Sequence, residues 1–130
     1  MRAQRGSVSV EFAAVLPLIA VAMLLVAQVG LLVAEQLAVH HAAREGARVA
    51  AVTNDDARAR ETAIEAGNLD PDRATVEVEP AVRDVGEPVV VHIAYRPTLI
   101  PLIEAFVPDG LTLEARVSMR TEREPPEAPP

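Results

Sequence analysis

A carboxylate stands at the start of the longest apolar run in this chain. Glu11 follows Gly6 by five positions and precedes a stretch from Phe12 to Ala34 that contains no charged side chain. As a helix this stretch would extend roughly 34 Å, which exceeds the thickness of about 30 Å of a bilayer's hydrocarbon core. Burying an unpaired carboxylate in a membrane costs free energy, so the position of Glu11 predicts a cationic group that meets it there.

The residues around Glu11 resemble a known processing signal. A basic leader, then Gly6, then Glu11 and Phe12 at the fifth and sixth positions after the glycine are similar to a class III prepilin signal of type IV pili. The longer segments GSVSVEFAAVLPL and AAREGARVAAV resemble the TadE-like family of minor pilins and pseudopilins of the tight-adherence pilus. The segments VVVHIAYRP and LEARVSMRTE resemble the C-terminal part of that family.

The resemblance implies a structural subunit that a prepilin peptidase cleaves between Gly6 and Ser7. It also implies partners: other pilin or pseudopilin subunits and the inner-membrane assembly platform, in addition to the lipid bilayer. Residues 1–6 would be a cytoplasmic leader. The mature chain would be a single-pass protein of the bacterial cytoplasmic membrane, with its C-terminal domain outside and a possible place in a pilus. Cations on the two sides of the apolar run are nearly balanced, so charge alone does not set this orientation.

Cleavage after Gly6 would supply the cation that Glu11 needs. The new α-amine of Ser7 is substantially protonated at neutral pH, and Ser7 and Glu11 lie four residues apart on one helical face. The pair could form within one helix. It could also join Glu11 of one subunit to Ser7 of the next, which would fix their axial register. The alternative is an uncleaved, membrane-tethered binding module that recruits an extracytoplasmic partner, with Glu11 at the lipid headgroups.

The helix predicted from the apolar run continues beyond it. Good helix formers predict one helix across the segment 7–52, with a kink at Pro17 because proline removes a backbone donor. Small residues recur at every fourth position, and such a row lets a second helix approach closely. In a chain this rich in alanine, composition alone is an equal explanation for the row. It consists of Gly30, Ala34, Ala38, Ala42, Gly46 and Ala50.

Residues 53–120 predict a small extracytoplasmic domain. Thr53 is the expected N-cap of a short second helix that ends near Ala66. Alternation of apolar and polar residues then predicts strands over Ala74–Glu79, Val89–Arg96 and Leu111–Arg120. The predicted fold class is therefore α+β: a long N-terminal transmembrane helix extended outside the membrane, a short second helix and a small three-stranded antiparallel sheet.

Two segments of this domain have distinctive compositions. Residues 97–107 are too apolar for an idle loop. They could dip toward the membrane or cover an edge of the sheet, and we expect them to pack against the protein. Residues 121–130 are charged and rich in proline, and we expect a disordered tail.

The composition offers little for catalysis or ligand binding. The chain has no cysteine, three histidines and a net charge of −7, which excludes thiol chemistry and argues against nucleic-acid binding. No nucleophile elbow, phosphate-binding glycine loop or H-E-x-x-H motif is present. We expect no enzymatic activity, no cofactor, no metal and no small-molecule substrate. The densest polar cluster on the long helix is expected to be a solvated face: His40, His41, Arg44, Glu45 and Arg48.

Overall fold

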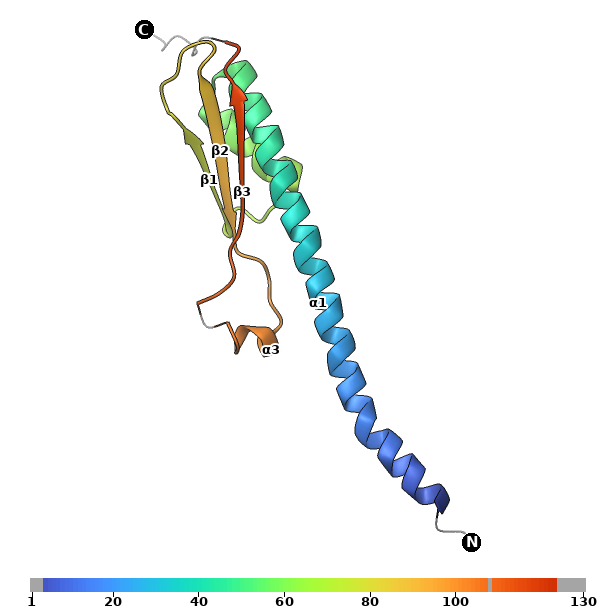
Figure 1. The fold of residues 1–130 in the computed structure, drawn as a ribbon. Helices are drawn as coiled ribbons and strands as arrows, with labels where there is room; N and C mark the ends of the chain where they lie inside the picture. Colours follow the sequence, from blue (N-terminus) through green and yellow to red (C-terminus); the bar gives the residue numbers. More distant parts are fainter. Residues whose placement is uncertain (1–3, 108, 124–130) are drawn as a thin grey trace. The chain divides into compact units, whose positions relative to one another are not determined.

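A computed structural model describes residues 4–107 and 109–123 of the chain, with side chains from Val10 onward (Figure 1). Contacts divide the chain into two compact units, Met1–Val33 and Ala34–Pro130. All side chains of the predicted leader, residues 1–6, and residues 124–130 of the predicted tail lie outside the described part.

The predicted α+β class is confirmed. The strands lie within two residues of their predicted ends, and a short third helix lies in the connection between the last two strands. The elements, in chain order, are α1 (Gln4–Thr53), α2 (Asp56–Gly67), β1 (Ala74–Glu79), β2 (Pro88–Tyr95), α3 (Pro101–Glu104) and β3 (Leu113–Arg120).

The first unit consists of the N-terminal part of α1, which from Phe12 to Val33 is apolar on nearly every side, with Gln28 as its polar residue. Large apolar side chains are exposed around the helix, from Val10 to Val33, and the helix continues through Pro17. A helix that is apolar all round needs either a protein core or a membrane around it. Among the described residues, α1 is the one helix long and apolar enough to cross a membrane.

The second unit is built on an antiparallel sheet with the order β1-β2-β3. The central strand β2 turns Val89, Val91 and Ile93 into the core, where all three are fully buried. In the register, Val91 stands opposite Val78 of β1 and Val117 of β3. Alanines of α1 and α2 complete the core on this face. The alternation read from the sequence thus corresponds to one buried and one solvated face.

The β3 strand lies along most of the part of α1 that belongs to this unit, residues 34–53. At one end, the Nε2 of Gln36 donates a hydrogen bond to the carbonyl oxygen of Glu114 at 2.9 Å. At the other end, the backbone N–H of Glu122 donates to the carbonyl oxygen of Ala51 at 2.8 Å. From Gln36 to Ala51 the helix rises roughly 22 Å, close to the length of a strand such as β3. The strand and the helix therefore run side by side in the same direction.

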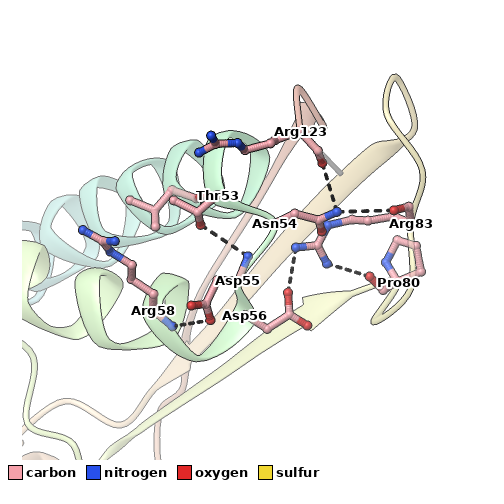
Figure 2. Close-up of polar contacts among 9 residues, drawn as sticks. Thr53, Asn54, Asp55, Asp56, Arg58, Pro80, Arg83 and Arg123 are labelled. Carbon is pink, nitrogen blue, oxygen red and sulfur yellow. Dashed lines mark hydrogen bonds and ion pairs between the residues drawn. The ribbon is translucent and has the colours of Figure 1, made fainter. Parts of the chain in front are cut away.

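At the junction between α1 and α2, the N-cap of α2 is not the predicted residue, Thr53. Thr53 is the last residue of α1, and its Oγ1 donates to the carbonyl oxygen of Val49 at 2.7 Å. Asn54 then takes a left-handed conformation with φ 54°, which asparagine tolerates better than most residues. Asp55 is the N-cap, because its side chain accepts a hydrogen bond from the N–H of Arg58 at 3.1 Å (Figure 2).

A buried arginine closes this junction (Figure 2). The side chain of Arg83 is 0% exposed; its Nη2 lies 2.7 Å from the Oδ1 of Asp56, and its Nη1 donates to the carbonyl oxygen of Pro80 at 2.8 Å. The side-chain amide of Asn54 donates to the carbonyl oxygens of Arg83 and Arg123. These contacts join the connection between α1 and α2 to the connection between β1 and β2.

Two further segments differ from their predictions. Thr121, placed in the expected disordered tail, is buried and exchanges backbone hydrogen bonds with Gly86 and Glu87 at 2.7 and 2.8 Å. These bonds extend the antiparallel pairing beyond the first residue of β2 and the last residue of β3. The connection 97–107 was expected to pack against the protein, but Leu102 and Phe106 are exposed. Backbone hydrogen bonds within this segment close the turn of α3.

Candidate functional site

The residues of the predicted processing signal lie in the first turns of α1. Gly6 and Ser7 have helical backbone, and Glu11 and Phe12 follow in the same helix with exposed side chains. Ser7 and Glu11 are four residues apart, so one helical turn separates them along a rise of roughly 6 Å. Ser7 and Glu11 thus lie on one face of the helix.

Glu11 is available to a group from outside the chain. Within the part whose side chains are described, no hydrogen bond or ion pair joins Glu11 to another residue. It is followed by exposed apolar side chains, beginning with Phe12. A carboxylate in that setting favours a cationic partner, because solvent cannot compensate its charge inside a membrane.

The predicted row of small residues falls into two parts. In the first unit, a Cβ added at Gly30 would meet no atom within 4 Å, and Ala34, at the start of the second unit, is exposed. Further along, Ala42, Gly46 and Ala50 are buried. The first part of the row is therefore open to another helix, whereas the last part is already covered.

The helix that covers the last part of the row is α2 of the same chain. A Cβ added at Gly46 would lie 2.9 Å from the Cβ of Ala63 and 3.2 Å from the carbonyl oxygen of Ala59. A Cβ added at Gly67 would lie 2.8 Å from the Cβ of Ala42. The two helices thus approach closely through a glycine on each. The signal for this contact was present in the sequence, because Ala59, Ala63 and Gly67 of α2 also recur at every fourth position.

Because one part of the row is covered and the other is open, replacing glycine by leucine should affect the stability of the second unit at position 46 but not at position 30. Gly46→Leu should destabilise the second unit by about 1–3 kcal/mol or more, since the added side chain has no room between α1 and α2. Gly30→Leu should leave that stability unchanged, because nothing lies within 4 Å of its Cβ. Urea unfolding of the full chain in detergent, followed by the fluorescence of the single tyrosine, Tyr95, measures both. Equal stabilities for the two variants would contradict the contact between α1 and α2.

Most side chains of the polar cluster on α1 are exposed to solvent. His40, His41 and Arg44 are exposed, and the Nη2 of Arg48 pairs with the Oε2 of Glu45 at 2.7 Å. Nowhere in residues 4–107 and 109–123 do three metal-ligating side chains come together. The described residues of this site thus comprise an exposed carboxylate, Glu11, and two open positions on α1, Gly30 and Ala34.

Comparison with known proteins bears on this N-terminal segment. Residues 6–48 match the model of the family described as TadE-like protein. No match was found among curated proteins or among solved structures. The matched stretch begins at Gly6, contains Glu11 and Phe12, and continues along α1 into the second unit. This family is a structural one associated with the tight-adherence pilus. The resemblance predicted from the sequence is thereby confirmed for residues 6–48, where the chain is similar to the TadE-like family.

Proposed function

We propose that the chain is a minor pilin or pseudopilin that takes part in assembling a tight-adherence pilus or a related secretion apparatus. One observation carries this proposal above the others. The family match begins at Gly6, and five positions later the exposed carboxylate of Glu11 opens an apolar helix long enough to cross a membrane. Processing after Gly6 gives that carboxylate a cationic partner, which accounts for an acid at the start of an apolar helix.

The proposed mechanism is electrostatic pairing between subunits in the membrane. A carboxylate at the bilayer centre costs about 2.5–3.5 kcal/mol on insertion scales, and less near the interface. Glu11 of one subunit recovers part of this cost by pairing with the Ser7 amine of its neighbour. The pairing favours assembled over dispersed subunits and sets how far one α1 is displaced along the next. Gly30 and Ala34, on the open part of the small-residue row, let the neighbouring helix approach.

In this proposal α1 anchors the chain in the cytoplasmic membrane, with the leader inside and the second unit outside. The partners are a prepilin peptidase, which removes residues 1–6, other pilin or pseudopilin subunits and the assembly platform. The described part of the second unit supplies a small folded body carried by the helix. Its solvated sheet face bears charged side chains such as Glu77, Glu114 and Arg116.

Processing is the direct test of this proposal. In cells with an active prepilin peptidase, the intact mass and N-terminal sequence of the membrane-extracted protein should show Ser7 as its first residue. Gly6→Leu should leave the chain uncleaved, since the side chain blocks the peptide bond from the peptidase while leucine still supports the helix. Ser7→Ala should be cleaved normally. A wild-type chain that keeps residues 1–6 in the presence of the peptidase would instead favour the uncleaved, membrane-tethered binding module.

A further inference from the structure

The connection between β2 and β3 presents apolar side chains to its surroundings. Phe106 is 80% exposed and Leu102 is 44% exposed, in a short helical segment that begins at Pro101. Hydrogen bonds from the N–H of Ala105 to Pro101 and from the N–H of Val107 to Ile103 continue the helical turn. Clustered exposed apolar side chains of this kind mark a surface that contacts something other than water.

The turn is amphipathic. At helical spacing, Leu102, Ile103 and Phe106 share one side, and Glu104 projects from the opposite side. Below the turn, the root of the connection is fixed: Pro97 is buried, and the guanidinium of Arg73 donates to the hydroxyl of Thr98 and to the carbonyl oxygen of Pro97. The apolar turn at residues 101–107 therefore follows a segment that is held in place by burial and hydrogen bonds.

The turn at residues 101–107 lies at a defined end of the second unit. The connection leaves β2 after Tyr95 and returns to β3 at Leu113, and these two residues are register partners. The neighbouring residue of β3, Glu114, is hydrogen-bonded to Gln36 of α1. Figure 1 shows α3 beyond this end of the sheet. Gln36 in turn follows Ala34, the last residue of the uncharged run, by two positions in the same helix.

We propose that the turn at residues 101–107 inserts its apolar side into the outer surface of the membrane that α1 crosses. The inference rests on the proposed membrane anchoring of α1. If the uncharged run ends at the bilayer surface, the end of the second unit marked by Gln36 lies at that surface, and the turn extends from the same end. Leu102, Ile103 and Phe106 then enter the boundary between headgroups and acyl chains, as the apolar face of an interfacial helix does. Glu104, on the opposite side, stays in water.

The proposal is tested with single cysteines, since the natural chain has none. Full-length Phe106→Cys carries a spin label in phosphatidylcholine nanodiscs, and collision rates with oxygen and with a water-soluble nickel chelate are measured. Two matched positions serve as references. Val82→Cys is a control at the opposite end of the sheet, where Val82 is 85% exposed. Val26→Cys reports on α1, where Val26 is 73% exposed.

We expect the label at position 106 to collide more with oxygen and less with nickel than the label at position 82, and so to resemble position 26. A label at 106 that is as accessible to nickel as the label at 82 would overturn the inference. So would a label shielded from both reagents, because that outcome indicates a second protein copy on the turn. If the collision rates place the label at position 26 in lipid and the label at position 106 in water, only this inference fails. If position 26 also reads as water, the membrane anchoring in the proposed function fails with it.

Discussion

Asp56→Asn is expected to lower the free energy of unfolding of the second unit by about 3 kcal/mol, the low end of the range of about 3–5 kcal/mol for breaking a buried ion pair. The substitution keeps the size of the side chain and removes its charge. It leaves the guanidinium of Arg83, with a side chain 0% exposed, without a carboxylate at 2.7 Å. The low end applies because the Asp56 side chain is 21% exposed, so water retains access to this partner. Urea unfolding followed by Tyr95 fluorescence measures the loss.

The chain provides a matched control for this substitution. Glu45 and Arg48 also form an ion pair at 2.7 Å, but the Arg48 side chain is 61% exposed. Glu45→Gln should therefore cost about 0.5 kcal/mol or less, as exposed helical pairs do. Arg83→Met should cost less than Asp56→Asn, since it leaves the partly exposed carboxylate to be solvated instead of a fully buried cation. Equal losses for Asp56→Asn and Glu45→Gln would show that burial of Arg83 is not what makes its pair important.

Glu11→Ala is expected to abolish most assembly while leaving processing after Gly6 intact. A charge-assisted pair contributes about 1.5–3 kcal/mol, which corresponds to roughly a 10- to 100-fold weaker association between neighbouring subunits. Sheared pilus fractions and membrane fractions, compared by immunoblot, separate the two effects. The mature chain should accumulate in the membrane and be depleted from filaments.

Two variants distinguish pairing from a change of side-chain shape. Glu11→Gln keeps the shape without the charge and should fail in the same way as Glu11→Ala. Ser7→Ala keeps the new α-amine and should assemble normally, because the proposed partner of Glu11 is the amine and not the hydroxyl. Wild-type assembly by Glu11→Ala would remove the register role from Glu11 and leave it as a residue of the headgroup boundary.

The parts of the fold that the sequence predicts are those determined by local pattern. The strand alternation through Val89, Val91 and Ile93 yields the buried face directly, because side chains of a strand alternate between its faces. The uncharged run from Phe12 to Ala34 predicts the apolar part of α1 for a similar reason. In both cases neighbouring residues carry the whole signal.

The parts that the sequence does not predict depend on contacts between distant segments. Arg83 lies among prolines, an aspartate and a glycine, a composition typical of an exposed turn, and its burial depends on Asp56 on α2. Thr53 satisfies a capping pattern, but α1 continues through it because Asn54 takes the left-handed turn one residue later. The small-residue row predicts the close approach of a second helix, with composition as an equal explanation, but it does not say which helix that is. Half of it packs against α2, which a search for the same spacing in α2 would have found.

The side-by-side course of β3 and α1 has a mechanical consequence. A pulling force transmitted along α1 from its N-terminal part would reach the second unit through contacts distributed between Gln36 and Ala51. Because strand and helix are nearly collinear, such a force loads these contacts together in shear instead of peeling them apart one after another. The sheet is thus attached to α1 in a geometry in which a pulling force is shared between these contacts.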